Sequence, residues 1–339
     1  MSGALLARAT SSKDAPPHSI PRRIAAGFFA CAAPDLDYLV SFVGPVEYLV
    51  THRGVTHSVV LLPLWALLYS WVLAKILREP RGWRALYGIT ALALAAHIAA
   101  DVITSYGTMV FAPFSDWRAA IGTTFIIDLW FSGIILAGLI ASALLYRSRI
   151  PAILSIAMLI GYVAFQFLLK LDAQQFGESY ARARGLSTAI VKVHPRPVSP
   201  FNWTVFVSDD DAHRFAHINL VRKEAKSYRP GDGFIAKLNA PYLPASQAIW
   251  VTRTRYGETN RELIEEAWNS EALGFFRWFA DLPAFDGFTE EAKCVWFTDL
   301  RFLTPGRDTV PFRFAACRER SGTPWRAYEQ ADPGRILLR

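Results

Sequence analysis

Apolar residues are concentrated in the first half of the chain, in four runs separated by short polar stretches. At 1.5 Å per residue, the run 59–77 would span about 28 Å as a helix, close to the roughly 30 Å of a bilayer core. The other runs are 86–105, 125–146 and 150–171, and the acidic, basic and histidine side chains inside the four are Lys75, His97, Asp101, Asp128 and Lys170. This pattern predicts four long transmembrane helices.

An earlier apolar segment, 24–50, contains several polar or helix-breaking residues. They are Pro34, Asp35, Asp37, Gly44 and Pro45. Non-helical backbone at membrane depth is tolerated only where protein buries it or where it lines a cavity. We therefore expect a broken membrane segment, which either crosses the bilayer or only dips into it.

The pattern changes at Asp172, after which polar and aromatic residues are mixed. Alternating stretches predict strands within 189–193, 203–208, 213–221, 248–254 and 292–303, and a helix near 261–281. The expected fold is an α-helical polytopic membrane domain, with four long transmembrane helices and a broken N-terminal segment, followed by a soluble α+β domain. We place the boundaries at 1–23 for an N-terminal basic segment, 24–171 for the membrane domain and 172–339 for the soluble domain.

The composition agrees with a membrane protein. Of the 339 residues 52% are hydrophobic and only 19% are charged, whereas soluble domains carry roughly 25% charged residues. The net charge of +7 fits either nucleic-acid binding or basic cytoplasmic loops. The basic residues flank the helices at alternating ends and form no stripe, so we expect no nucleic-acid partner.

The basic residues also predict an orientation. If the broken segment crosses the membrane, one side receives Arg8, Lys13, Arg22, Arg23, Arg78, Arg81, Arg84, Arg147 and Arg149, and the short loops of the other side hold little beyond Arg53 and Arg118. The basic side should be cytoplasmic. The C-terminal domain would then be extracytoplasmic, where Cys294 and Cys317 are able to pair. If the segment only dips in, this bias weakens.

Three polar motifs stand in or beside the apolar runs, where ionisable groups are costly and mark candidate functional sites. PDLD supplies Asp35 and Asp37, which an extended turn would direct toward one ion, or which cap a helix. HRGVTHS supplies His52, Arg53 and His57, or forms a solvated interfacial loop. HIAADVITSYGT supplies His97 and Asp101, which share a helix face at a spacing of four and either bind a metal or form a packed pair.

Successive helices run in opposite directions, so these motifs and Asp128 should converge at one membrane face. Histidine and carboxylate ligands suit zinc or manganese, as one or two ions. The candidate ligands are Asp35, Asp37, His52, His57, His97, Asp101 and Asp128, and we assign catalytic roles to Arg53, His57 and Asp101. Arg53 would clamp an anionic substrate such as a phosphate, assisted by Arg118, or contact lipid headgroups. The histidines of the C-terminal domain, His194, His213 and His217, lack a ligand spacing, and we assign that domain no chemistry.

In order, PDLDYLV, HRGVTHS, HIAADVITSYGT, PFSDWR and FIIDLWF resemble the membrane-bound metal-dependent hydrolases of the YdjM type, some of which are LexA-regulated. The resemblance covers about 24–171. It implies a multi-pass bacterial inner-membrane protein with a divalent metal bound by Asp35, Asp37, His52, His57, His97 and Asp101, and supports Asp128 less firmly. Family members carry a Gln or His before a GALLA-like run, whereas GALLAR begins here at Gly3. Either the start codon is misplaced or this chain has one ligand fewer.

The leading hypothesis is a membrane-embedded hydrolase in which metal-activated water attacks a phosphoester or related ester of a lipid-like substrate at the membrane face, with the bilayer itself as a partner. The alternative is a non-enzymatic membrane protein with a structural metal site and a partner-binding tail. A transporter is the weakest candidate. It predicts polar residues at mid-membrane on several helices, whereas the polar residues of this chain are expected to gather at one membrane face.

Overall fold

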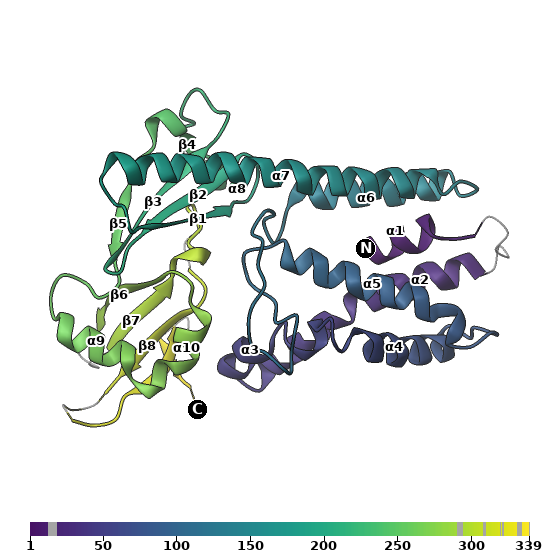
Figure 1. The fold of residues 1–339 in the computed structure, drawn as a ribbon, viewed down its shortest axis with the longest axis horizontal. Coiled ribbons are helices and arrows are strands. Elements are labelled where there is room, and N and C mark those ends of the chain that lie inside the picture. The colour runs from purple at the N-terminus through teal and green to yellow at the C-terminus, as the bar shows by residue number, and fades with distance from the viewer. Residues whose placement is uncertain are drawn as a thin grey trace. The chain divides into compact units, whose positions relative to one another are not determined.

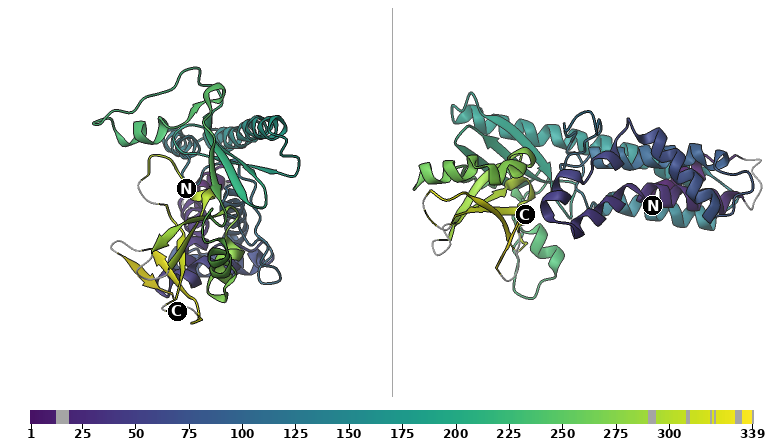
Figure 2. Two further views of the ribbon diagram at one scale, coloured as in Figure 1. Left: turned by 90° about the vertical axis from the view of Figure 1, so that its left-hand side faces the viewer. Right: turned by 90° about the horizontal axis from the view of Figure 1, so that it is seen from below.

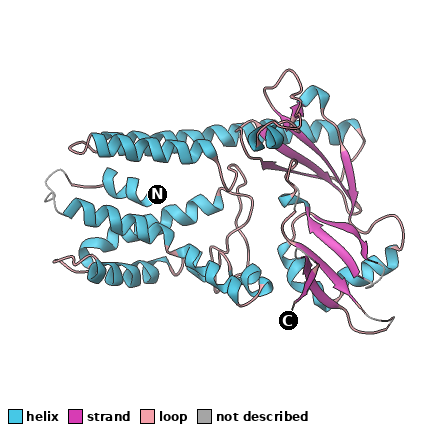
Figure 3. Ribbon diagram, turned by 180° about the vertical axis from the view of Figure 1, so that it is seen from behind, coloured by secondary structure: helices cyan, strands magenta, loops and turns pink. Residues whose placement is uncertain are grey.

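The computed structural model describes residues 1–12, 19–289, 294–307, 310–318, 320, 322–330 and 334–338. Lys13 lies outside these residues. The chain divides into two compact units, one formed by Met1–Val40 with Thr51–Leu168 and the other by Ser41–Val50 with Leu169–Arg339. Helices make up the described structure of the first unit apart from its loops, and the strands belong to the second (Figure 3).

The helices of the first unit pack side by side (Figures 1 and 2). In chain order they are α1 (Ser2–Ala9), α2 (Ser19–Ala32), the 3-10 helix η1 (Pro34–Phe42), the 3-10 turn η2 (Val55–His57), α4 (Leu62–Ile76), α5 (Arg84–Val102), α6 (Leu129–Leu144) and the first part of α7 (Ile150–Ala183); η1 continues into the second unit, which also holds most of α3 (Pro45–Thr51). The element that the sequence did not predict is α1.

The prediction of four long transmembrane helices is wrong for two of them. Among the described residues, α5 with 19 residues and α7 with 34 are long and apolar enough to cross a membrane. Two bent pairs raise the number of candidate spans to four: α2 with η1, bent by 44°, and Pro45–His57 with α4, bent by 83°. α4 has 15 residues and α6 has 16, about 23 Å each as straight helices.

Local hydrogen bonds explain both shortened helices. The backbone N–H of Val59 donates to Val110 at 2.9 Å, and the Ser58 hydroxyl accepts from Val60 and Leu61, so these residues form a turn before α4. At α6, the Asp128 carboxylate accepts from the backbone N–H groups of the second and third following residues at 2.9 and 2.8 Å. This is an N-cap, and it fixes the start of α6 after Asp128.

Small residues allow the helices of the first unit to approach closely. A Cβ at Gly27 of α2 would lie 2.4 Å from the Gly3 carbonyl oxygen of α1, and a Cβ at Gly138 of α6 would lie 2.0 Å from Ser155 Oγ of α7. α1 is buried between two helix groups, because Ala7 packs with α2, α4 and α5 and Leu5 packs with α6 and α7. Such contacts are typical of helices that associate in lipid.

The second unit contains two five-stranded sheets. The first sheet has the order β1 (Ile190–Pro195), β2 (Asn202–Ser208), β3 (Ala212–Asn219), β4 (Leu243–Pro244), with β5 (Val251–Thr254) also paired to β3. The second is an antiparallel meander of β6 (Pro283–Thr289), β7 (Cys294–Asp299), β8 (Arg313–Cys317), β9 (Arg326–Gln330) and β10 (Arg335–Leu337). One face of the first sheet packs on the last part of α7, through Val193, Trp203 and Ala173.

The expected sheet-containing C-terminal domain is therefore present, with differences in detail. The apolar run that ends at Leu171 continues as helix to Ala183, because Ala173 and Phe176 pack on the sheet. The helix expected at 261–281 is divided into α9 (Arg261–Asn269) and α10 (Gly274–Phe279), and α8 (Phe234–Asn239) precedes them. Cys294 and Cys317 lie opposite each other on β7 and β8 and form a disulfide.

The close approach of α6 and α7 generates a first prediction. A Gly138→Val substitution inserts a side chain where Ser155 already lies and should destabilise the folded protein by about 1–3 kcal/mol, the usual cost of overpacking. Gly133, on the same helix, has open space around its Cβ position, so Gly133→Val is the matched control. Thermal unfolding in detergent measures both, and equal melting temperatures would contradict the packing described.

Candidate metal centre

Three segments of the first unit meet at the candidate site. η1 follows the end of α2 and carries Asp35 and Asp37, the turn before α4 carries His57, and the last turns of α5 carry His97 and Asp101. His97 and Asp101 are four residues apart and therefore project from one face of α5, as the sequence predicts. η1 has about three residues per turn, so Asp35 and Asp37 point in different directions, unlike in the extended turn expected from the sequence.

Four donor atoms converge. His57 Nε2 lies 3.1 Å from His97 Nε2, 3.0 Å from Asp101 Oδ2 and 3.7 Å from Asp35 Oδ1. His97 Nε2 lies 3.3 Å from Asp101 Oδ2 and 3.4 Å from Asp35 Oδ1. All four atoms fall within 4.8 Å of one another, so this group could hold a metal ion.

These distances match the edges of a coordination tetrahedron. Zinc binds imidazole nitrogen and carboxylate oxygen at roughly 2.0–2.2 Å, and the edge of a tetrahedron is about 1.6 times the distance from its centre to a corner. Ligand atoms around such an ion are therefore about 3.3–3.6 Å apart. Five of the six distances within the group run from 3.0 to 3.7 Å, and the sixth, between Asp35 and Asp101, is at most 4.8 Å.

The polar atoms of the group need a proton or a metal ion to be satisfied. Asp101 Oδ2 is buried and has no hydrogen-bond partner, although two imidazole nitrogens face it. A buried, unsatisfied carboxylate oxygen costs roughly 1–3 kcal/mol or more. The Nε2 atoms of His57 and His97 face each other, and a lone pair on each would be repelled unless a proton or a metal ion lay between them. The residues present thus fit a divalent metal.

Asp37 lies on the opposite side of the His57 ring from this group. Its Oδ2 is 3.4 Å from His57 Nδ1 and accepts from the Thr56 hydroxyl and the Arg53 backbone N–H, both at 3.0 Å. Its Oδ1 lies 2.8 Å from His52 Nδ1. The Thr56 hydroxyl that donates to Asp37 lies 2.9 Å from His57 Nδ1, so Asp37 and Thr56 together fix the ring orientation and leave Nε2 available to a metal. The structure thus places Asp37 and His52 behind the four donors.

Arg53 contacts the group from another direction. Its Nη2 lies 2.9 Å from Asp101 Oδ1, and its Nη1 donates to Thr104 at 3.0 Å. The guanidinium stacks on one side of the Tyr106 ring, and the Arg118 guanidinium also lies over that ring. The side chain is buried, so in this structure Arg53 orients Asp101, whereas the sequence suggested a clamp for a substrate anion.

Asp128 has partners other than the four donors. Besides capping α6, its Oδ2 accepts from the Tyr162 hydroxyl at 2.8 Å and from Gln166 Nε2 at 3.3 Å, both on α7. These contacts join α6 to α7 by polar groups within apolar helices. The structure does not bring Asp128 into the group formed by Asp35, His57, His97 and Asp101.

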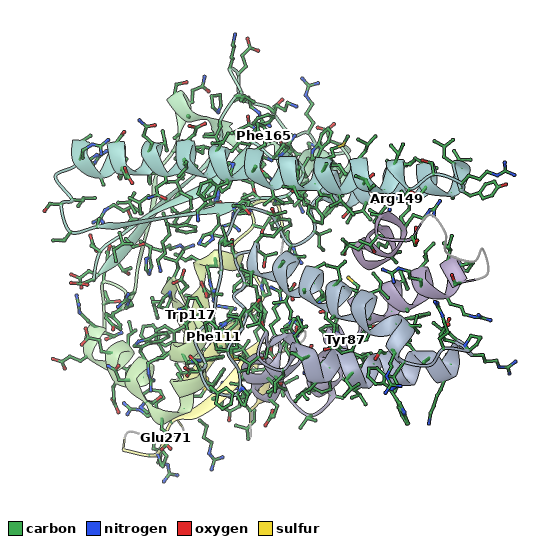
Figure 4. The ribbon with its side chains drawn as sticks, turned by 45° about the vertical axis from the view of Figure 1, so that its right-hand side comes forward. Tyr87, Phe111, Trp117, Arg149, Phe165 and Glu271 are labelled. Carbon is green, nitrogen blue, oxygen red and sulfur yellow. A yellow bond between two sulfur atoms is a disulfide. The ribbon has the colours of Figure 1, made fainter. Side chains whose placement is uncertain are left out.

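The loop 103–124 braces the site. The backbone N–H groups of Ile121 and Thr123 donate hydrogen bonds to carbonyl groups at the end of α5. The backbone N–H of Met109 donates to the Arg53 carbonyl at 2.9 Å. Its exposed tip carries Phe111 and Trp117, whose rings stack with centroids 6.0 Å apart (Figure 4). The backbone around His57 and Asp101 is thus fixed by hydrogen bonds as well as by helix packing.

The sequence reasoning missed two residues beside the site. Cys31, taken as a small buried hydrophobe, lies beside the His97 side chain and 3.2 Å from the Ser2 hydroxyl. Tyr106 packs its ring against His52, with centroids 5.5 Å apart. The available signal was position: Cys31 lies one helical turn before Asp35, and Tyr106 lies in the same motif as Asp101.

A second prediction follows from the converging donors. His57→Ala and Asp101→Ala each remove one buried donor, so both variants should lose most of the metal that the protein binds after purification in detergent. Asp128→Asn is the control and should keep it. Elemental analysis by mass spectrometry checks this, and full metal content in the first two variants would refute the assignment. Loss of metal in Asp128→Asn would instead indicate that Asp128 belongs to the metal site.

A third prediction concerns Asp37. If it orients His57 from behind, Asp37→Ala should weaken metal binding about 10–100-fold and leave some binding intact. Competition with chelators of graded affinity measures the change. Unchanged affinity would show that Asp37 has no orienting role, and a loss as complete as that of His57→Ala would indicate a direct ligand.

Comparison with known proteins gives the family of the helical unit. Residues 1–173, half of the chain, match the family described as YdjM inner membrane protein. The chain is similar to the uncharacterized protein YfhP of Bacillus subtilis (strain 168), with 28% identity over 142 residues, which are 41% of this chain and 42% of that protein. No solved structure matches the chain. The matched region contains every donor of the candidate metal centre, and the chain belongs to the YdjM inner membrane protein family.

Proposed function

We propose that the protein is a membrane-embedded, divalent-metal-dependent hydrolase that acts on a phosphoester or related ester of a lipid-like substrate. The observation that carries this proposal is the unequal exposure of the four donors. The side chains of His57, His97 and Asp101 are 0%, 11% and 12% exposed, whereas that of Asp35 is 59% exposed. Three buried ligands with one accessible position are the pattern of catalytic rather than structural zinc sites.

The chain's own residues then have distinct tasks. His57, His97 and Asp101 hold the ion, Asp37 fixes the His57 ring, and Arg53 fixes the Asp101 carboxylate. When bound, a divalent ion acts as a Lewis acid and lowers the pKa of a water molecule toward roughly 7. Asp35 lies on the accessible side, where its carboxylate is placed to accept a proton from water. Zinc fits the donor types and distances, and manganese is the second candidate.

Exposed apolar side chains support an amphiphilic substrate. Leu36, Tyr38 and Leu39 follow Asp35 on η1 and are 58–60% exposed. A lipid-like molecule is able to lay its apolar part against them while its ester group reaches the accessible side of the donors. Neither Arg53 nor Arg118 supplies a free cation for a phosphate, because both have partners in the structure. An ester without a phosphate group is therefore better supported as the substrate than a phosphoester.

We propose a multi-pass protein with the metal site and the C-terminal domain on the extracytoplasmic face. Supporting this, basic residues gather at the connections of the first unit: Arg8 donates to the turn between α6 and α7, and Arg149 donates to Ser11 (Figure 4). Arg22 and Arg81 both pair with Glu79. A basic end is expected to face the cytoplasm. The Cys294–Cys317 disulfide agrees with an oxidising compartment for the C-terminal domain.

A structural metal site is the second candidate function. Four protein donors complete a tetrahedron, as in closed zinc sites, and the C-terminal domain would then recruit a partner. The two candidates differ in the role of Asp35. In a structural site its removal costs stability and metal, whereas in a catalytic site its removal leaves the three buried donors and the metal in place.

The deciding experiment measures hydrolysis and metal together. Purified protein in detergent is assayed with bis(p-nitrophenyl) phosphate and with p-nitrophenyl esters of short and long acyl chains. We expect turnover that a chelator abolishes and zinc or manganese restores, that prefers long acyl chains, and that falls at least 100-fold in Asp35→Asn with metal retained. The control variant Asp128→Asn should keep both turnover and metal. Metal binding without turnover on any substrate, together with metal loss in Asp35→Asn, would favour the structural site.

A further inference from the structure

A second polar cluster lies in the C-terminal unit, on one face of its first sheet. His194 of β1 is directly opposite Thr204 of β2, and Thr204 is directly opposite His217 of β3. Residues that are opposite in register share a face, and Arg196, two residues after His194, continues the same face. Phe206, on the same face, packs against Leu282, which directly precedes β6, and against Leu300, which directly follows β7. Arg196 also donates to the carbonyl of Arg301, just after β7, so the cluster belongs to the interior between the two sheets.

Hydrogen bonds connect the cluster. Arg196 Nε donates to Thr204 Oγ1 at 2.6 Å, and Thr204 Oγ1 lies 2.8 Å from His217 Nδ1. The ring of Tyr242 packs edge-on against His217, with centroids 5.9 Å apart. Four side chains from separate segments are thus held in one arrangement.

The guanidinium of Arg196 has no counter-ion among the described residues. Arg196 as a whole is 4% exposed. The adjacent carboxylate, Asp299, is already bound by Arg301 at 2.7 Å and by the backbone N–H groups of Leu282 and Arg301. Arg196 Nη1 donates to the Arg301 carbonyl at 2.9 Å, but Nη2 has no partner. A buried, unpaired charge costs several kcal/mol.

Two other buried side chains that interact electrostatically with Arg196 have unsatisfied polar atoms. They are the Tyr242 hydroxyl and the ring of His194, whose two nitrogens, one a donor and one an acceptor, both lack a partner. Burial, reinforced by the Arg196 charge, lowers the pKa of His194 and lowers that of His217 to about 3. Both rings are neutral at pH 7, and a neutral imidazole keeps one N–H donor. The cluster thus offers one positive charge and three groups with an unpartnered N–H or O–H, and it has no counter-ion among the described residues.

We propose that this cluster is a binding site for one small inorganic anion, held by Arg196, Tyr242 and His194 between the sheets of the C-terminal domain. A halide or a phosphate-type oxyanion supplies the missing negative charge and accepts the unsatisfied N–H and O–H groups. Because Arg196 reaches the segment after β7 and Thr204 lies in β2, a bound anion joins the first sheet to the second. The anion would therefore stabilise the folded domain by mass action.

The test uses the full chain in detergent, with chloride, bromide and phosphate compared against gluconate at constant ionic strength. Hydrogen exchange of the peptides covering β1–β3 is the local readout. In the wild type we expect exchange about tenfold slower when the anion is present at ten times its Kd than in gluconate. Arg196→Met should remove this dependence, and in gluconate it should be at least as protected as the wild type, because no unpaired charge remains buried.

The controls separate binding from general salt effects. Arg214→Met changes a partly exposed arginine of the same sheet that already pairs with Asp209, and it should keep the full anion dependence. Tyr242→Phe removes one donor with little change in shape and should weaken the dependence, and it serves if Arg196→Met fails to fold. Protection by phosphate alone, by halides alone or by both identifies the kind of anion. Equal exchange in all salts, or an unchanged response in Arg196→Met and Tyr242→Phe, would overturn the proposal.

Discussion

The first unit depends on one electrostatic constraint: two imidazole nitrogens and a buried carboxylate oxygen lie within 3.0–3.3 Å of one another among apolar helices. Apolar surroundings make such a grouping expensive unless each lone pair is satisfied. Contacts around it hold it in place. Asp37, through Thr56, fixes the His57 ring, Arg53 fixes the carboxylate, and the loop 103–124 fixes the backbone beneath both.

The same constraint explains why the helices depart from simple membrane spans. Bringing His57 to the end of α5 requires the chain to turn before α4, and bringing Asp35 there requires α2 to give way to a 3-10 helix. Both breaks appear as bends, of 83° and 44°. The shortened helices are compensated by close contacts between small residues, such as Gly3 with Gly27, which let backbones approach without a large side chain between them.

The sequence predicted what depends on local pattern and missed what depends on partners. Apolar runs identified α5 and α7, alternation identified β1 to β3, and the four-residue spacing of His97 and Asp101 placed both on one face. The positions of Asp37 and Asp128 could not be read this way, because a carboxylate that orients a ligand and one that caps a helix look the same in sequence as one that binds a metal. The helix α1 was missed because eight residues carry too little periodicity.

The charges around the candidate metal centre favour one divalent ion over two. Asp35, Asp37 and Asp101 contribute −3 and Arg53 contributes +1, which leaves −2 with neutral histidines. One divalent cation balances this charge, whereas a second would leave +2 buried among apolar helices, at a cost of several kcal/mol. Protonating His57 and His97 gives the same sum, but would place N–H bonds on two Nε2 atoms 3.1 Å apart. A single ion held by His57, His97 and Asp101, with Asp35 on its accessible side, satisfies the charge count and the geometry together.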